Sequence, residues 1–296
     1  MIDNVPSTFS VGTVLESVFE HFRDGSGMFF RILIAPGLFS AVSGALILRL
    51  VPGIGASEAT ADPLETLKAL GPLMISFFVF WVSGTLVGAA ALGAMVCAVE
   101  DMPRSSGAGG SAVRAWSRAG RHLPAIAGVG GIYAGMTLAG VGGSTLMGGA
   151  LGGVSGLIHP LLVVISLPVI FAGLLATLVL LVRYAVAVPA CVREGAGPLA
   201  AMRRSATLTR GHRMAVAVCL FVTLLVNYVV SILLQGPFLL AGWFISGNAG
   251  APGWVVVLQT IAGGVGHAVG GAFVLIGVAV LYEELSRFAP SGAAGA

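Results

Sequence analysis

The sequence predicts an all-α polytopic membrane protein, and three observations carry this prediction. Hydrophobic residues make up 57% of the 296 residues and charged residues only 9%. The mean hydropathy is +1.00. An average soluble domain has roughly 25% charged residues, so this composition excludes a water-soluble domain of useful size. The third observation is that the apolar residues form six long runs, which are separated by more polar linkers.

Each apolar run is long enough to cross a membrane as a helix. A helix needs about 20 residues to span the hydrocarbon core. Backbone groups have no water partners in lipid, so the runs must be helical wherever they face lipid. The predicted membrane helices cover 28–50, 72–99, 123–146, 160–190, 214–245 and 254–282. We expect them to form a single integral membrane domain over residues 1–296.

The arginines predict how these helices are oriented. Linkers 100–122 and 191–213 carry four and five arginines, whereas the alternate linkers contain Lys68 as their one lysine or arginine. The excess of positive charge on cytoplasmic loops then places both termini in the cytoplasm. The net charge of +3 is therefore a topology signal, and we expect no nucleic-acid partner. The N-terminus lacks a basic segment ahead of an apolar one, so we expect no cleavable signal peptide.

A threefold internal repeat is predicted from three similar helix ends: CAVE at 97–100, CVRE at 191–194 and LYEE at 281–284. A short amphipathic segment precedes the first helix of each pair. The predicted unit is an interfacial helix followed by a helix pair, over about 7–100, 108–194 and 197–288. We expect the three units to be related by rotation about an axis along the membrane normal.

The amphipathic segments allow two interpretations. Their predicted apolar faces are Val11, Val14, Leu15, Val18, Phe19 and Phe22 in the first, Val113, Trp116 and Ala119 in the second, and Leu199, Met202 and Ala206 in the third. Such segments lie in the membrane interface. They serve either to position the following helix or to bind anionic lipid headgroups through their arginines, at roughly 1 kcal/mol per charge. Both roles are compatible.

Small residues recur at four-residue spacing in the helix over 123–146, at Ala127, Gly131, Gly135, Ala139 and Gly143. Such a ladder lets another helix approach closely, so we expect it to pack against a neighbour. Gly266 and Gly270, in the last membrane helix, predict the same on a smaller scale.

Polar residues inside the predicted membrane helices are costly unless they face protein, water or a partner. The helix over 214–245 carries a polar stripe of Thr223, Asn227, Ser231 and Gln235, and the last helix carries His267. One interpretation is hydrogen bonding between helices, and the other is a substrate path. Arg183 is expected to point into the bundle toward the acidic helix ends, with snorkelling to the headgroups as the alternative.

Two fragments resemble sites of intramembrane enzymes. Gly153-Val154-Ser155-Gly156 together with His267 resembles the serine and histidine pair of rhomboid proteases, but the His and Asn of that family's early helix are absent. The segment from Glu283 to Arg287 is one residue short of the EExxxR motif of CAAX-type proteases.

Cys97, Cys191 and Cys219 are expected to be free thiols. We therefore predict no catalytic residue, cofactor or metal site.

A closer resemblance rests on about 30 residues. These are Arg183-Tyr184, Pro189, Glu194-Gly195, the stretch GPLAAMRRSATLTRGHR that begins at Gly197, and Leu281 to Leu285. They look like the membrane domain found at the N-terminus of some bacterial glycerophosphoryl diester phosphodiesterases and in stand-alone six-helix proteins. The resemblance implies a multi-pass protein of the bacterial cytoplasmic (inner) membrane. The catalytic barrel of those enzymes is expected to be absent, because few residues follow the last membrane helix.

The sequence thus predicts a non-enzymatic membrane protein that binds a lipid or amphiphile at the cytoplasmic leaflet, or that acts as a membrane scaffold. The alternative is a transporter with a polar path between the last two membrane helices, and an intramembrane hydrolase comes third. The expected partners are membrane lipids with anionic headgroups, and a protein partner is not predicted. The candidate contacts are Arg183, Asn227, Gln235, His267, Arg203 and Arg210.

Overall fold

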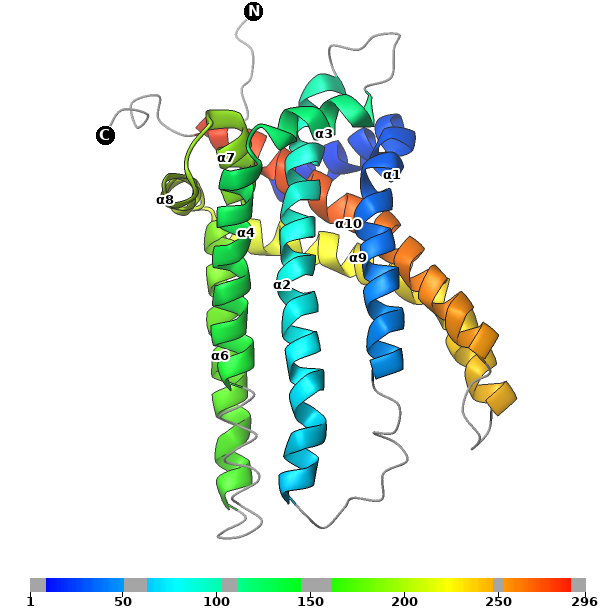
Figure 1. The fold of residues 1–296 in the computed structure, drawn as a ribbon. Helices are drawn as coiled ribbons and strands as arrows, with labels where there is room; N and C mark the ends of the chain where they lie inside the picture. Colours follow the sequence, from blue (N-terminus) through cyan, green and yellow to red (C-terminus); the bar gives the residue numbers. More distant parts are fainter. Residues whose placement is uncertain (1–8, 51–62, 103–110, 145–160, 247–252, 289–296) are drawn as a thin grey trace, which may run out of the picture.

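The computed structural model describes residues 9–50, 63–102, 111–144, 161–246 and 253–288, and these residues form helices joined by short turns (Figure 1). Six of the described segments are long and apolar enough to cross a membrane. They are Val11–Ser43, Phe78–Asp101, Leu123–Gly142, Leu167–Glu194, Arg213–Gly242 and Val257–Phe288. The all-α prediction with six membrane helices is confirmed, and the chain is a multi-pass membrane protein.

The described helices form six long passes with short helices at one end. Their bounds are α1 Val11–Leu50, α2 Pro63–Asp101, α3 Ala112–Gly120, α4 Leu123–Thr137, the π-helical η2 Leu138–Gly142, α6 Leu161–Tyr184, α7 Ala187–Glu194, α8 Pro198–Leu208, α9 Arg213–Ser246 and α10 Gly253–Phe288. The short helices α3, α7 and α8 lie at the same end as the start of α1 and the end of α10 (Figure 1). We call this the capped end.

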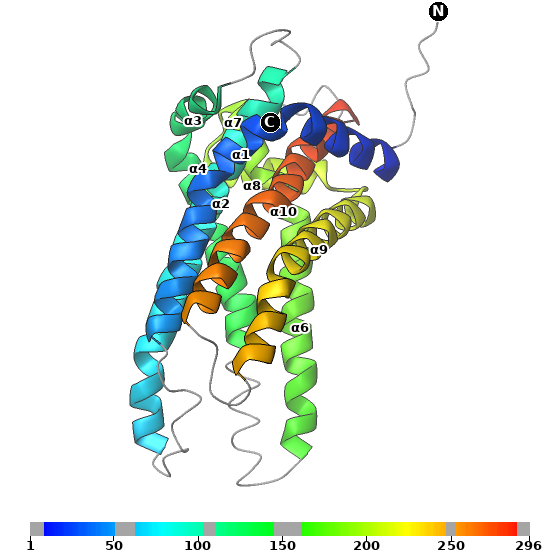
Figure 2. The same cartoon turned by 90° about the vertical axis from the view of Figure 1, so that its right-hand side faces the viewer.

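The capped end therefore contains both arginine-rich segments, the start of α1 and the end of α10. The predicted topology requires all of these to lie on one side. Which side of a membrane it faces stays a prediction. The N-terminal part of α1 crosses the capped end, and the helix then bends down along the bundle (Figure 2). The first predicted interfacial segment is thus continuous with its membrane helix, whereas α3 and α8 are separate helices. The threefold relation between the units is not shown and stays a prediction.

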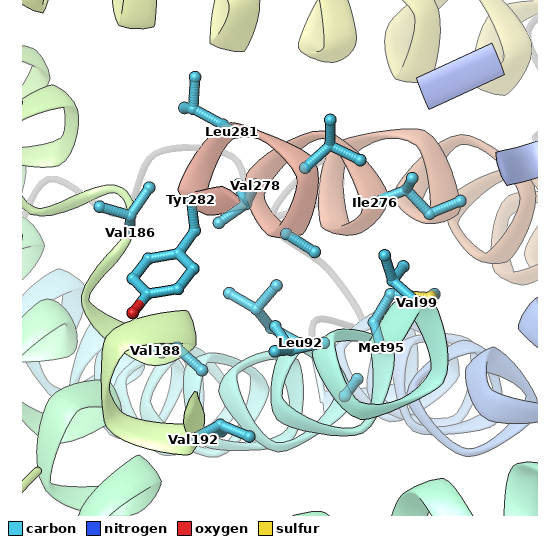
Figure 3. Packing of buried hydrophobic residues seen from close by; sticks show 14 of the residues in the cluster. Leu92, Met95, Val99, Val186, Val188, Val192, Ile276, Val278, Leu281 and Tyr282 are labelled. Carbon is cyan, nitrogen blue, oxygen red and sulfur yellow. The ribbon is translucent and has the colours of Figure 1, made fainter. Parts of the chain in front are cut away.

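The hydrophobic core lies toward the capped end. It is built from the second half of α2, from α7 and from the second half of α10, with Met95, Val188 and Ile276 fully buried (Figure 3). Within the most apolar part of each span, 56% of the residues of α2 and 61% of those of α10 are buried. The corresponding share is 17% to 28% in the other four spans. These two helices are therefore central. Toward the opposite end the helices spread apart, so that α6 and α9 end far from one another in Figure 1.

The predicted helix over 160–190 is broken, which the apolar pattern did not indicate. The chain turns at Ala185 and Val186, and α7 then continues to Glu194. Pro189 explains the break, because a proline inside a helix lacks an N–H donor and its ring clashes with the carbonyl four residues earlier, here that of Ala185. The predicted linker 51–71 is also shorter than expected, because α2 begins at Pro63.

The small-residue ladder of α4 and η2 does not pack as predicted. Ala127, Gly131, Gly135, Ala139 and Gly143 are all exposed. No described residue lies within 4 Å of a side chain built at any of the three glycines. The expectation of close helix contact at this ladder is therefore wrong within the described chain. The helix instead uses other residues, among them Ile126 and Val129, to face the core.

Candidate functional site

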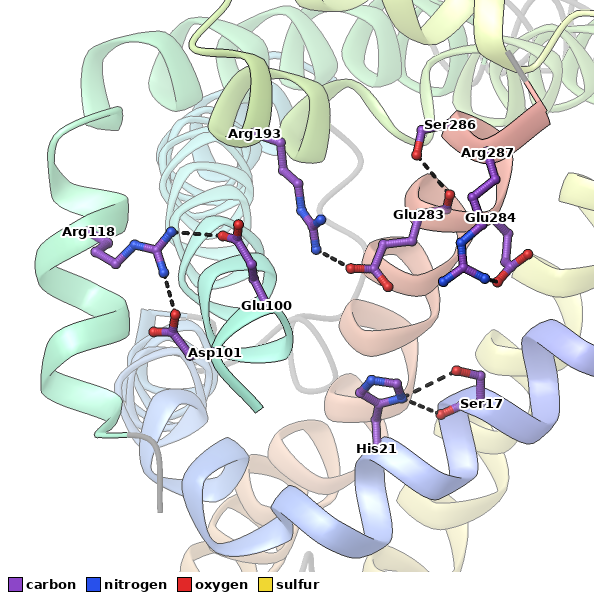
Figure 4. A network of polar contacts seen from close by, with 10 residues as sticks. All are labelled: Ser17, His21, Glu100, Asp101, Arg118, Arg193, Glu283, Glu284, Ser286 and Arg287. Atoms are coloured by element: carbon purple, nitrogen blue, oxygen red, sulfur yellow. Dashed lines mark hydrogen bonds and ion pairs between the residues drawn. The ribbon is translucent and has the colours of Figure 1, made fainter. Parts of the chain in front are cut away.

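The acidic residues that close the membrane helices are held by arginines at the capped end (Figure 4). The Arg118 guanidinium of α3 donates to Glu100 at 2.7 Å and to Asp101 at 2.5 Å, so that α3 is fixed to the end of α2. Partial burial by itself lowers the pKa of Arg118. The hydrogen bond to Glu100 and the charge of Asp101 outweigh burial, so the net pKa is raised. The arginine therefore stays charged and committed to this pair.

Two further arginines fasten α7 and α8 in the same way. Arg193 of α7 pairs with Glu283 of α10 (Figure 4). Arg204 of α8 donates to Glu194 at 2.8 Å, and the Tyr282 hydroxyl donates to the same carboxylate oxygen at 2.8 Å. These contacts join α2 to α3, and they join α7 to both α8 and α10. We call Arg118, Arg193 and Arg204 the paired arginines.

The break between α6 and α7 is stabilised by buried hydroxyl groups. The Arg183 carbonyl accepts hydrogen bonds from Ser205 at 3.3 Å and from Thr209 at 3.0 Å. The Val186 N–H donates to the Ser205 hydroxyl, and the Tyr133 hydroxyl donates to the Tyr184 carbonyl. Buried backbone groups need such partners. The hydroxyls therefore make the break possible and tie the end of α8 to the end of α6.

A second set of arginines at the capped end points outward. These side chains are exposed, and none has a carboxylate within ion-pair distance among the described residues. We call them the outward arginines: Arg114 and Arg121 next to α3, Arg203 and Arg210 on and after α8, and Arg213 at the start of α9. Arg203 and Arg210 were predicted to contact headgroups, and their exposure leaves them able to do so.

Each part of the outward set lies beside an exposed apolar side chain. Val113 is 78% exposed next to Arg114, Leu199 is 68% exposed one turn before Arg203, and Met214 is 79% exposed next to Arg213. Val113 and Leu199 belong to the predicted apolar faces of these segments, and they lie on the outer sides of α3 and α8. The buried sides of α3 and α8 are formed largely by small residues, including Ala115, Ala119, Ala201 and Ser205. Met202 and Leu208 of α8 are also buried, so only part of the apolar surface of these helices is left on the outer side.

An apolar groove of about 480 Å³ begins below this arginine layer. Leu178 and Leu181 of α6 line one wall together with Ala185 just after it, and Ala217 to Leu224 of α9 line another. The α9 lining extends over seven positions, or about 10 Å along the helix at 1.5 Å per residue. One leaflet has roughly 15 Å of hydrocarbon, half of the whole core. The groove therefore fits within the leaflet adjoining the capped end.

Arg183 does not point toward the acidic helix ends, so that prediction is wrong. Its side chain is exposed, and its guanidinium lies 5.3 Å from the ring centroid of Tyr184. No ion pair to Arg183 occurs among the described residues. The physical reason is that Arg118, Arg193 and Arg204 already occupy the acidic helix ends. Arg183 is placed instead on the outer surface, with its backbone bonded to the end of α8.

The polar stripe of α9 packs against glycines of α10. A Cβ built on Gly277 would lie 2.8 Å from the Thr223 methyl group, and one on Gly270 would lie 2.7 Å from the Asn227 Cα. Gln235 lies similarly over Gly263, at 3.4 Å. The two helices are therefore in close contact along the stripe. This favours the packing interpretation, and it confirms that Gly266 and Gly270 receive a neighbouring helix, because Ser231 contacts Gly266.

Two of the candidate residues differ in their surroundings. The Asn227 Oδ1 atom is buried and has no hydrogen-bond partner among the described residues. His267, predicted to lie in the bundle interior, is exposed on α10. That prediction is wrong, because the glycines that precede and follow His267 occupy the face turned toward α9.

The described residues assemble no metal-binding cluster. Cys97, Cys191 and Cys219 are free and buried. No group of three or more His, Cys, Asp or Glu side chains in the described part of the chain could hold a metal ion. Ser155, the serine of the rhomboid-like pair, lies outside the described residues.

Comparison with protein-family models, with curated proteins and with solved structures found no match to the chain. The resemblance to the membrane domain of glycerophosphoryl diester phosphodiesterases therefore stays a prediction, and the functional argument depends on the geometry of this chain alone.

Proposed function

We propose that this is a non-enzymatic integral membrane protein whose capped end binds anionic lipid in the adjoining leaflet. The observation that carries the proposal is the position of the outward arginines. They are exposed beside Val113, Leu199 and Met214, three apolar side chains that are themselves exposed. A surface that presents apolar and cationic side chains together is typical of helices in the membrane interface.

The charges available to lipid are those of the outward arginines. The paired arginines are neutralised by carboxylates within 3 Å, so they add little to the field at the membrane surface. The outward arginines have no such compensation among the described residues. Each contributes roughly 1 kcal/mol of attraction to an anionic membrane surface. A preference for anionic over zwitterionic lipid follows from this excess charge.

The apolar groove supports an amphiphile as the ligand. Its described lining is hydrophobic apart from the Tyr133 ring, and it lies one to three turns from the arginine layer along α9. Such a groove in a membrane is filled by hydrocarbon, since no polar ligand would find partners there. If the predicted topology is correct, the leaflet is the cytoplasmic one of a bacterial inner membrane.

The transporter alternative is less well supported. It requires a polar path between α9 and α10, but Thr223, Asn227 and Gln235 pack directly against glycines of α10. A scaffolding role is compatible with lipid binding and adds no separate site.

Native mass spectrometry tests the proposed function. The detergent-purified protein is delipidated, mixed with equal amounts of phosphatidylglycerol and phosphatidylcholine of the same acyl chains, and released from the micelle. We expect several-fold more bound phosphatidylglycerol. Replacing all outward arginines with glutamine should remove the preference while the unfolding temperature in detergent stays the same. Equal binding of the two lipids by the unaltered protein would contradict the proposal.

A further inference from the structure

A cleft of about 830 Å³ lies at the capped end, where three separate parts of the chain meet. Phe9 precedes α1, Phe288 ends α10, and the residues from Arg210 to Ala215 connect α8 to α9. The Phe9 ring lies 5.4 Å from the His212 ring and 6.4 Å from the Phe288 ring, measured between centroids. These rings form one wall. Gly211 has a φ of 93°, which lets the chain turn sharply between the two arginines.

The cleft is positively charged. Arg210 and Arg213 both line it, both are exposed, and no acidic side chain is among its lining residues. Neither guanidinium has an ion-pair partner in the described part of the chain. Two free guanidinium groups at one opening suit a phosphate group, whose oxygens accept their fork-like donors.

One face of α9 leads from the cleft to the apolar groove. Met214 lines the cleft, whereas Val218 and Phe221 line the groove. These three residues are spaced four and seven apart, so they lie on the same side of the helix. All three are exposed, at 79%, 43% and 65%. A ligand that follows this face would pass from the arginines into an apolar channel.

Arg183 lies close to the same junction. Its carbonyl is bonded to Ser205 and Thr209, the residue before Arg210. Its neighbours Val182 and Ala185 line the groove. The end of α6, the end of α8 and the start of α9 therefore bring the backbone of Arg183 close to Arg210 and Arg213 at one end of the groove.

We propose that the cleft and the groove form one site for a single anionic glycerophospholipid. Arg210 and Arg213 hold the phosphodiester, and one acyl chain lies in the groove between α6 and α9. This inference rests on the proposed function and gives it a location and a ligand class. The apolar face formed by Met214, Val218 and Phe221 favours a lipid over a free phosphate ion, because a phosphate ion gains nothing from contact with an apolar surface.

Matched double variants test the polar half of the site. Arg210→Gln with Arg213→Gln should lower retained phosphatidylglycerol about tenfold in the native mass spectrometry assay. Arg114→Gln with Arg121→Gln removes the same charge from the α3 side and should lower retention clearly less, because these two arginines add only to the general attraction of the capped end for anionic lipid. Equal losses in both pairs would overturn the site and leave the proposed function standing, because the attraction would then be diffuse. Failure of the unaltered protein to prefer phosphatidylglycerol would overturn both.

Filling the groove tests the apolar half. Ala217→Trp places a large ring among Leu181, Val218 and Phe221 and should reduce lipid retention although both arginines are present. The control is Ala41→Trp, in the separate groove of about 290 Å³ between α1 and α10, and it should leave retention unchanged. Unchanged retention in Ala217→Trp would overturn the inference. So would competition by millimolar inorganic phosphate, since the ligand would then be a free anion.

Discussion

Arg203 and Arg204 are adjacent in the chain but belong to two different regions of the capped end. Arg204 lies against the core and is bonded to Glu194, whereas Arg203 is exposed on the outer side of α8. The same contrast separates Arg118 from Arg114 and Arg121 on and next to α3. One region uses arginine to join helices, and the other presents arginine to the surroundings.

The difference shows why counting charges is insufficient to locate a binding surface. All of these arginines contribute to the positive-inside signal, but only those without a carboxylate partner leave charge for an external anion. The short helices α3 and α8 produce the division, because their buried sides are narrow and each has one arginine near the core. The contrast can be tested by changing one region at a time.

The largest expected effect is in the paired region. Arg193→Leu leaves Glu283 half-buried without its partner. Loss of an exposed pair costs about 0 to 1 kcal/mol and loss of a buried one about 3 to 5. We expect an intermediate loss of about 2 to 3 kcal/mol, seen as a lower unfolding temperature in detergent. Arg203→Leu is the matched control and should unfold at the original temperature. If both variants unfold alike, the division into two regions is incorrect.

A smaller loss is expected at the break between α6 and α7. Ser205→Ala removes the hydroxyl without adding an atom and leaves the buried Val186 N–H without its partner. An unsatisfied buried group costs about 1 to 3 kcal/mol. Thr207→Val is the control, because Thr207 is exposed on the same helix. Circular dichroism during heating should separate the two variants, and an equal effect would mean that the break does not depend on Ser205.

The sequence was sufficient to predict the helices, because length and hydropathy determine whether a segment crosses a membrane. All six predicted helices are present. Their acidic ends Glu100 and Glu283 both lie at the capped end (Figure 4), and Glu194 is bonded to Tyr282, the residue before Glu283. The break at Ala185 was not predicted. Pro189 was a usable signal, since a proline inside an apolar run is expected to disturb the helix in the turn that precedes it.

The partners of the charges could not be predicted. Arg183 was the expected partner of the acidic ends because it lies within an apolar run. Arginines of the short helices form those ion pairs instead. Helical periodicity does not separate Arg118 from Arg114, because the face that meets the core depends on how α3 packs against α2. For the same reason, the exposure of the ladder from Ala127 to Gly143 could not be foreseen from its spacing.

The smallest effect is expected at Arg183. Because its side chain is exposed and lies over Tyr184, Arg183→Leu should change the free energy of unfolding in detergent by no more than about 0.5 kcal/mol. Thermal unfolding followed by tryptophan fluorescence measures this change. A loss comparable to that of Arg193→Leu would show that Arg183 belongs to the paired region after all.

Unfolding temperature in nanodiscs of different charge tests the central claim most directly. A ligand that binds only the folded state raises its stability, so the protein should unfold at a higher temperature in phosphatidylglycerol nanodiscs than in phosphatidylcholine nanodiscs of equal chain length. The difference should shrink as salt is raised from about 0.05 M to about 0.5 M, because salt screens exposed charges. The screening length is roughly 10 Å at 0.1 M and becomes shorter at higher salt. Replacing the outward arginines with glutamine should abolish it. An unfolding temperature that is the same in both lipids at low salt would contradict the account.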